Sequence, residues 1–160
     1  GKIRFVKHNW ETLSASVTGF CRYFEQETVN CFCVLPLYHV SGLMQFMRTF
    51  LTGGNLILYS YQRLEKAWQN QDIATLHQLQ NIAQNNYFLS LVPTQLQRLL
   101  NYGAGNWLSQ FKAVLLGGAP PWKSLLATAR HYQDDICYFS VSSKLTQILR
   151  SSRSSSRRLV

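Results

Sequence analysis

The fold is decided by the stretch from Asn30 to Tyr59, NCFCVLPLYHVSGLMQFMRTFLTGGNLILY. It begins with a short apolar run rich in strand-forming residues, which Pro36 ends. Apolar residues at helical spacing follow, and Gly53 and Gly54 end that helix, as glycine often does at a C-cap. Another apolar strand, residues 55–59, comes next. The stretch therefore predicts a strand–helix–strand unit.

The same alternation continues towards the C-terminus. Residues 63–84 are polar, with apolar side chains at helical spacing, and residues 87–92 form an apolar strand that a proline stops. Thr94 suits the N-cap of the Leu-rich helix that follows. Strands separated by helices of this length favour an α/β fold with a mostly parallel sheet and helices on both faces. We expect two further strands, at residues 111–116 and 135–139, and a helix between them at residues 122–132.

Three strand-end loops are the candidate ligand-binding region, because ligands of parallel sheets bind at the carboxyl ends of the strands. These loops are residues 36–42, 93–94 and 117–121. Gly117 and Gly118 in the third loop would let the backbone come close to a flat or phosphorylated ligand. We expect the three loops to converge on one cleft.

The first loop carries His39, directly after a strand and before a helix. Its imidazole suits two roles equally well, a ligand-facing side chain or a hydrogen-bonded histidine in a tight turn. Ser41 and Gly42 would begin the helix with free N–H groups, which favour an anion.

Other site chemistries fit the sequence poorly. A Ser–His–acid hydrolase is disfavoured because there is no Gly-x-Ser-x-Gly elbow, and no acid lies between Glu27 and Glu65. The four histidines lie far apart without companion ligands, so no metal ligand is assigned. Cys31 and Cys33 would share one strand face as small buried hydrophobes, and the cysteines show no disulfide framework. The cysteine usage favours a reduced, cytoplasmic protein.

Composition limits the class of protein. The chain has 160 residues, the span of one domain, and its 46% of hydrophobic residues rules out disorder over most of the length. Only 14% of the residues are charged, which fits strands buried on both faces. No run approaches the roughly 18 apolar residues of a membrane-spanning helix, and the N-terminus has no signal-peptide core. Without an initiator Met, the chain is expected to begin inside a longer reading frame.

The net charge of +9 belongs mostly to the end of the chain. Five basic residues and no acid follow Ser140, whereas residues 1–139 carry 11 basic and 7 acidic residues. We expect the basic, Ser/Arg-rich tail, residues 140–160, to be disordered, as a solvated extension, a binding arm or sequence from outside the ancestral frame. Aromatic residues do not interleave with its arginines, so bases would find no stacking partner there.

Four segments, in this order, resemble the adenylate-forming (AMP-binding) superfamily of acyl-CoA ligases, synthetase adenylation domains and luciferases. Residues 1–4, GKIR, are similar to the end of its phosphate loop, and residues 35–43, LPLYHVSGL, to its Leu-Pro-Leu-Phe-His-x-x-Gly motif. Residues 90–94, SLVPT, resemble the next block, and residues 111–120, FKAVLLGGAP, the strand and loop that cover the adenine. The resemblance spans about residues 1–135 and is strongest to the 2-succinylbenzoate–CoA ligases.

The resemblance implies a two-step reaction with ATP, Mg²⁺ and coenzyme A. A carboxylate attacks the α-phosphate of ATP to give an acyl-adenylate and pyrophosphate, and the coenzyme A thiol then displaces AMP. The acid would be 2-succinylbenzoate, whose thioester belongs to menaquinone and phylloquinone biosynthesis.

The resemblance also assigns residues to roles. His39 would lie between the acyl pocket and the α-phosphate, and Arg4 takes the position of the phosphate-loop lysine, so both are the candidate catalytic residues. The candidate nucleotide-binding residues are Gly1, Lys2, Gly117, Gly118, Ala119 and Pro120. The candidate acyl-binding residues are Ser41, Gly42, Val92, Pro93 and Thr94.

Several family features have no counterpart in this sequence. They are the Ser/Thr/Gly-rich front of the phosphate loop, the Tyr-Gly-x-Thr-Glu motif, the ribose-binding aspartate and the small domain with the catalytic lysine. We therefore expect residues 1–139 to be an incomplete piece of the adenylating-enzyme N-terminal domain, and the isolated chain to lack ligase activity. Two alternatives are a non-catalytic nucleotide- or acyl-binding module, and nucleic-acid binding through the basic tail; a membrane partner is not expected.

Overall fold

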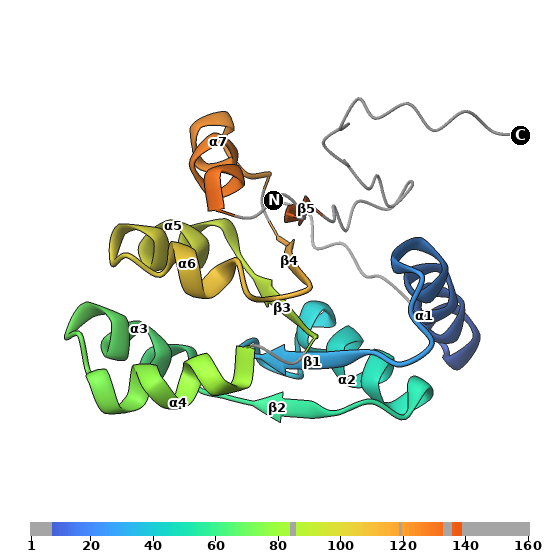
Figure 1. The fold of residues 1–160 in the computed structure, drawn as a ribbon. Helices are drawn as coiled ribbons and strands as arrows, with labels where there is room; N and C mark the ends of the chain where they lie inside the picture. The colour runs from blue at the N-terminus through green and yellow to red at the C-terminus, as the bar shows by residue number, and fades with distance from the viewer. Residues whose placement is uncertain (1–7, 84–85, 119, 133–135, 139–160) are drawn as a thin grey trace, which may run out of the picture.

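A wholly parallel, five-stranded sheet forms the centre of the protein in the computed structural model, which describes residues 8–83, 86–118, 120–132 and 136–138. The strands lie in the order β2-β1-β3-β4-β5 (Figure 1). The expected α/β class and parallel sheet are confirmed. The strands are β1 (Asn30–Cys33), β2 (Leu56–Leu58), β3 (Tyr87–Leu91), β4 (Ala113–Leu116) and β5 (Ile136–Tyr138).

Helices cover both faces of this sheet, again as the sequence predicts. In Figure 1, α3 to α7 lie to the left of the strands and α1 lies to the right, where it contacts α2. The helices are α1 (Trp10–Phe24), α2 (Val40–Thr52), α3 (Tyr61–Gln69), α4 (Ile73–Ala83), α5 (Pro93–Asn101), α6 (Gly105–Leu108) and α7 (Lys123–Tyr132).

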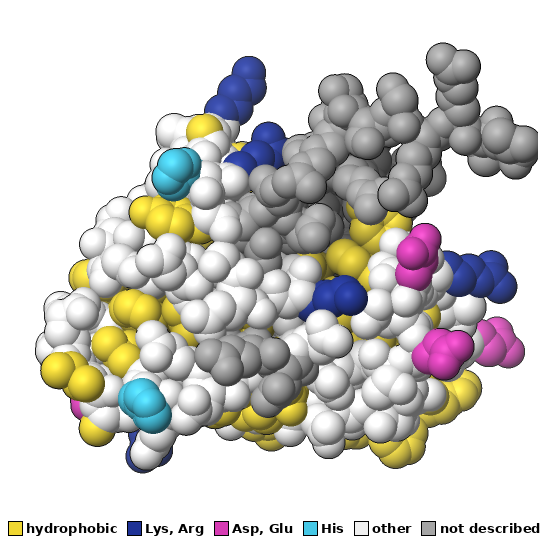
Figure 2. Space-filling model, in the orientation of Figure 1, with side chains coloured by type: hydrophobic (Ala, Val, Ile, Leu, Met, Phe, Trp, Pro, Cys, Tyr) yellow, Lys and Arg dark blue, Asp and Glu magenta, His cyan; other side chains and the backbone are white. Residues whose placement is uncertain are grey.

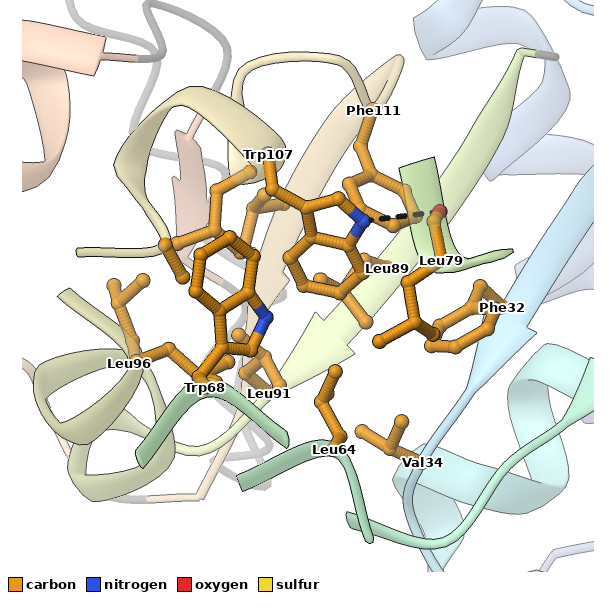
Figure 3. Packing of buried hydrophobic residues seen from close by; sticks show 14 of the residues in the cluster. Phe32, Val34, Leu64, Trp68, Leu79, Leu89, Leu91, Leu96, Trp107 and Phe111 are labelled. Atoms are coloured by element: carbon orange, nitrogen blue, oxygen red, sulfur yellow. Dashed lines mark hydrogen bonds between the residues drawn. The ribbon is translucent and has the colours of Figure 1, made fainter. Parts of the chain in front are cut away.

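Alternate residues of the central strands are buried in two separate cores. Phe32 of β1 and Leu89 of β3 pack into the larger core, beneath α3 to α7 (Figure 3). Trp107 of α6 lies at the centre of that core, and its indole N–H donates to the Leu79 carbonyl at 3.2 Å. Cys31 and Phe88, the neighbours of Phe32 and Leu89, face the smaller core against α1. Burial on both faces explains why the strands are almost continuously apolar.

The cysteines of β1 are buried, as expected. Burial is the main reason why the pKa of the Cys31 thiol rises to about 12. Burial also raises the pKa of Cys33, whose thiol donates to the Leu35 carbonyl at 3.3 Å. A thiol with a raised pKa is a poor nucleophile, so neither cysteine suits covalent catalysis.

The helical spacing that begins at residue 63 is divided between two helices, α3 and α4, because the chain turns at Gln71, which adopts a left-handed φ of 51°. One local prediction is wrong. Thr94 is not the N-cap of α5, since Val92 holds that position and Pro93 is the first helical residue. Proline favours that first position because it has no N–H to leave unpaired. The short helix α6 was not expected at all.

The glycine C-cap of α2 and the strand near residue 136 are both found where the sequence predicts them. Gly53 ends α2 with a φ of 68°, and β5 covers Ile136–Tyr138. The predicted tail, residues 140–160, lies outside the described residues. Within the described part of the chain, none of the helices has the length and apolar character needed to cross a membrane.

Candidate functional site

The three strand-end loops meet where the chain reverses its direction across the sheet. From β1 the chain moves outwards to β2, and it then returns past β1 to β3, β4 and β5. The connections after β1 and β3 therefore leave the sheet in opposite directions from the carboxyl ends of these strands. Open α/β sheets bind their ligands at such a point.

Close contacts join the three loops. A Cβ atom placed on Gly117 would lie 3.1 Å from the Ser41 hydroxyl oxygen, and one on Gly118 would lie 3.6 Å from Cγ1 of Val92. The Gly117 N–H also donates to the Leu91 carbonyl at 3.0 Å. Predicted acyl-binding and adenine-binding residues are thus brought side by side.

His39 is the N-cap of α2, and its side chain is exposed. Its backbone N–H closes a turn by donating to the Pro36 carbonyl at 3.1 Å, and its ring lies 4.7 Å from that of Tyr38. The imidazole makes no hydrogen bond to any of the described residues. The turn expected here is present, while the imidazole itself stays available to a ligand.

The first turn of α2 has no side-chain cap from the described residues. Its first three N–H groups, on Val40, Ser41 and Gly42, belong to the end of a helix that lacks intrahelical partners and carries partial positive charge. Gly42 is buried, and a Cβ atom there would lie 2.2 Å from the Pro36 carbonyl oxygen. Only glycine lets the turn approach the loop so closely.

The start of α5 is organised differently. Val92 is the N-cap, the ring of Pro93 is buried, and Thr94 is exposed. The side-chain oxygen of Gln95 accepts a hydrogen bond from the Val92 N–H at 3.0 Å. The sequence prediction missed Gln95, although a glutamine three residues after an N-cap is a known capping signal.

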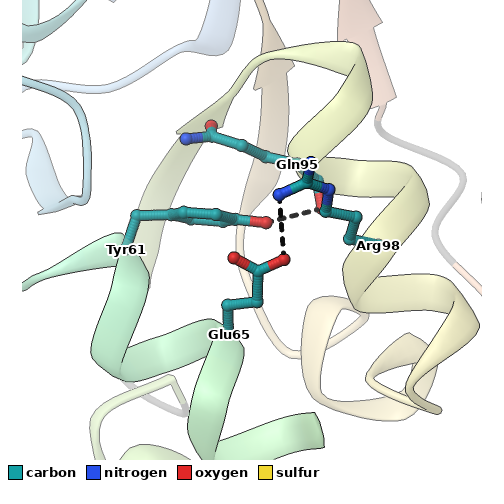
Figure 4. A network of polar contacts seen from close by, with 4 residues as sticks. All are labelled: Tyr61, Glu65, Gln95 and Arg98. Carbon is teal, nitrogen blue, oxygen red and sulfur yellow. Dashed lines mark hydrogen bonds and ion pairs between the residues drawn. The ribbon is translucent and has the colours of Figure 1, made fainter.

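A polar network attaches the start of α5 to α3 (Figure 4). The Tyr61 hydroxyl donates to the Gln95 backbone carbonyl at 3.4 Å, and Arg98 forms an ion pair with Glu65 at 3.1 Å. Burial, followed by the nearby Glu65 carboxylate, raises the pKa of Tyr61 to about 12. The hydroxyl therefore stays protonated and able to donate over the ordinary pH range.

The third loop offers bare backbone to a ligand. Gly118 has a φ of 87°, a conformation that side-chain-bearing residues rarely adopt, and both Gly118 and Pro120 are exposed. Ala119 lies outside the described residues, as do Gly1, Lys2 and Arg4 of the predicted phosphate end. The structure therefore assembles the acyl and adenine parts of the predicted site from its described residues.

The assembled loops are uncharged. None of the residues 36–42, 92–94 or 117–121 is Asp, Glu, Lys or Arg. On the face shown in Figure 2, the acidic side chains gather instead over α1. Among the described residues, no group of three or more His, Cys, Asp or Glu side chains could hold a metal ion. These residues do not fit a Mg²⁺ site.

The sequence model of a protein family described as "AMP-binding enzyme" matches residues 2–138. The chain belongs to this family.

Curated relatives narrow the similarity. A 2-succinylbenzoate–CoA ligase from Listeria monocytogenes is 29% identical over 126 residues, which are 79% of this chain and 24% of that protein. The enzyme of the same name from Staphylococcus epidermidis is 36% identical over 110 residues, 69% of this chain and 21% of that protein. The chain thus spans at most about a quarter of the length of these relatives.

A solved structure shares the fold. The o-succinylbenzoate CoA synthetase from Bacillus subtilis, in complex with its acyl-adenylate intermediate, matches with a TM-score of 0.66 and 22% identity. The match covers 84% of this chain and 26% of that one. The same synthetase was solved with ATP and magnesium ion, and there the TM-score is 0.60, with 20% identity over 84% of this chain and 26% of that one.

Proposed function

We propose that this chain is part of an ATP-dependent carboxylic acid–CoA ligase that works through an acyl-adenylate, with 2-succinylbenzoate as the acid. The observation that carries the proposal is the proximity of Ser41 and Val92 to the Gly117–Gly118 loop at the switch point of the sheet. Family membership and the shared name of the curated relatives support the same reaction and the same acid.

The glycine loop suits the adenine of ATP. Gly117 and Gly118 present backbone without side chains, so a flat ring can lie against them at van der Waals distance. Pro120 is exposed beside them and adds a rigid apolar edge. We assign these three residues, together with Ala119, to the nucleotide.

The start of α2 suits the reacting groups. In the first step a carboxylate approaches the α-phosphate, and two negative groups must come together. The N–H groups of Ser41 and Gly42 lie at the positive end of the α2 dipole and would stabilise that charge without reorganising. The His39 imidazole adds a donor beside them, which gives it a role at the α-phosphate.

The start of α5 suits the acyl group. The half-buried Val92 gives the segment an apolar side chain, Pro93 is buried next to it in the chain, and the exposed Thr94 adds a hydroxyl. Fixing the acid and the nucleotide on neighbouring loops makes the attack effectively intramolecular, which lowers its barrier. Coenzyme A would be the second substrate, and its thiol would release AMP in the complete enzyme.

The phosphate end of the site is assigned to Gly1, Lys2 and Arg4, of which Arg4 would supply the fixed positive charge. The family's magnesium-binding motif has no counterpart in the sequence. We propose on this ground that the isolated chain binds adenylates without releasing pyrophosphate.

Nuclear magnetic resonance of the ¹⁵N-labelled chain tests the binding part of the proposal. Titration with AMP, and with benzoyl sulfamoyl adenosine as a stable mimic of an aroyl-adenylate, should shift the amide signals of Ser41, Val92, Gly117 and Gly118. Amides of α4, on the far side of the larger core, serve as the control and should not move. Shifts confined to α4, or none at all, would contradict the assignment of the site.

Genomic sequencing around the reading frame separates a ligase from a non-catalytic binding module. A Ser/Thr/Gly-rich phosphate loop upstream of Gly1 and a Tyr-Gly-x-Thr-Glu motif downstream of residue 135 are the expected result. If neither occurs in any frame, the ligase function fails, and adenylate binding alone would remain to be explained.

A further inference from the structure

The backbone of Val92 is held by hydrogen bonds with two residues of α5, Gln95 and Leu96. Val92 is the N-cap of α5, and its N–H needs an acceptor. Its own side chain is apolar, so it cannot accept a hydrogen bond from the first turn as a serine or aspartate would. Gln95 bonds both backbone groups of Val92. Its side-chain oxygen accepts from the Val92 N–H, and its own N–H donates to the Val92 carbonyl, each at 3.0 Å. The Leu96 N–H donates to the same carbonyl at 3.1 Å, and the three bonds together fix the orientation of Val92 at the point where β3 passes into α5.

That orientation determines the spacing of two loops. Cγ1 of Val92 lies 3.6 Å from the position of a Cβ atom on Gly118, so the side chain rests against the adenine-side loop. A rotation of the Val92 backbone would move this side chain and change the gap between the acyl and adenine sides.

Gln95 is itself anchored from outside the site. The Tyr61 hydroxyl of α3 donates to its backbone carbonyl at 3.4 Å, and the Glu65–Arg98 ion pair joins the same two helices one turn further on (Figure 4). Gln95 is half-buried between these contacts. Its side chain can therefore transmit the position of α3 to Val92.

We propose that Gln95 is a positioning residue, which holds Val92 at the width that an acyl-adenylate requires between the two loops. The inference rests on the function proposed above and adds a residue to it. Gln95 acts through Val92 and is not assigned a contact with the ligand.

Three variants of the full chain test this role. Gln95→Leu removes the acceptor, and Gln95→Glu keeps an acceptor at the same distance. Gln97→Leu is the matched control, because it removes a side-chain hydrogen bond from the same helix, the 2.7 Å bond to Asn101. The probe is benzoyl sulfamoyl adenosine, with its affinity measured by calorimetry and the exchange rate of the Val92 amide proton measured by NMR.

Only Gln95→Leu should weaken probe binding, by about tenfold, a change typical of one lost hydrogen bond. The same variant should speed exchange at the Val92 amide, and Gln95→Glu should restore both properties. Gln97→Leu should leave both unchanged even if it lowers the melting temperature as much, and that contrast separates positioning from general stabilisation. If Gln95→Leu does not fold, Gln95→Asn takes its place, since its side chain is one methylene too short to reach the Val92 N–H.

The outcomes distinguish the two proposals. Equal probe affinity in Gln95→Leu and the unsubstituted chain would overturn the positioning role and leave the proposed function intact. Failure of the unsubstituted chain to bind the probe would overturn the proposed function, and the positioning role with it.

Discussion

The helices α2 and α5 both begin at the candidate site, yet their first turns are secured by different means. α2 begins at His39 without a side-chain cap from the described residues, and its Gly42 is pressed against the carbonyl of Pro36. α5 begins at Val92, whose N–H is taken by Gln95, and its first helical residue is a proline without an N–H. Close packing secures one turn, and hydrogen bonding secures the other.

The two first turns therefore differ in what they tolerate and in which N–H groups they leave unpaired. The first turn of α2 has no side-chain cap from the described residues, and it tolerates no added volume at Gly42. The capped turn of α5 uses the N–H groups of Val92 and Gln95 internally and has none at Pro93, so it has fewer donors to offer than the turn of α2. Substitutions that add volume should therefore damage α2 most, whereas changes of polarity should act mainly through α5.

The largest effect is expected from Gly42→Ala. The new methyl group would lie 2.2 Å from the Pro36 carbonyl oxygen, so the backbone of α2 or of the loop must shift. We expect the free energy of unfolding, measured with urea, to fall by about 3 kcal/mol, the upper end for overpacked sites. Gly19→Ala is the control, because nothing lies within 4 Å of its Cβ position. That change in an exposed part of α1 should stabilise the chain by up to about 1 kcal/mol. Equal effects of the two substitutions would show that α2 is not packed on the loop as described.

A smaller effect is expected where α2 meets the glycine loop. Gly117→Ala would place a methyl group 3.1 Å from the Ser41 hydroxyl, which can yield by rotating. We expect the free energy of unfolding to fall by about 1 kcal/mol, a typical value for a single substitution, and to recover in part when Ser41→Ala is added. The coupling energy from the urea unfolding of both single variants and the double variant should be about 0.5 to 1 kcal/mol. Strict additivity would mean that the two loops do not touch.

Much of this arrangement could be predicted from the sequence, because proline and glycine mark where each strand and helix ends. Pro36, Pro93 and Gly53 gave the order of strands and helices, and the parallel topology then placed the loops at one edge of the sheet. The break at Gln71 is not marked by a glycine, and the apolar helical spacing continues through it. A local signal does follow it, because the Asp72 carboxylate accepts from the Thr75 N–H at 3.3 Å and from the Thr75 hydroxyl at 2.7 Å, as the side chain of an N-cap does.

The roles at α5 were harder to predict because two local preferences compete. Threonine is a favoured N-cap, which pointed to Thr94, but proline is favoured at the first helical position, which points to Val92. The structure follows the proline, and this choice brings Gln95 within reach of the Val92 N–H. A capping residue with no polar side chain left no signal of its own.

The support beneath α5 should weaken at high pH. Tyr61 has a pKa raised from an ordinary value of 10 to about 12, so the folded chain holds its phenolic proton more tightly than the unfolded chain does. Its contribution to stability is therefore complete below pH 10 and is lost as the pH rises from 10 towards 12. The difference in urea midpoint between the unsubstituted chain and Tyr61→Phe should shrink between pH 8 and pH 11. Arg48, whose pKa burial lowers to about 10, has the opposite sign but is common to both chains and cancels. A constant difference would indicate that Tyr61 is not buried against Glu65.

The smallest effect is expected from Thr94→Ala, which tests which residue begins α5. If Thr94 were the N-cap, losing its hydroxyl would cost about 1 kcal/mol. Its side chain is exposed in the second helical position, so we expect a change in unfolding free energy within about 0.5 kcal/mol. Asn9→Ala is the positive control, because the Asn9 side chain caps α1 by accepting from the Thr12 N–H at 2.8 Å. Its substitution should cost about 1 kcal/mol in the same urea experiment. Equal losses in the two variants would show that Thr94 is the N-cap and that Gln95 does not bond the Val92 N–H. The contrast between α2 and α5 would then not hold.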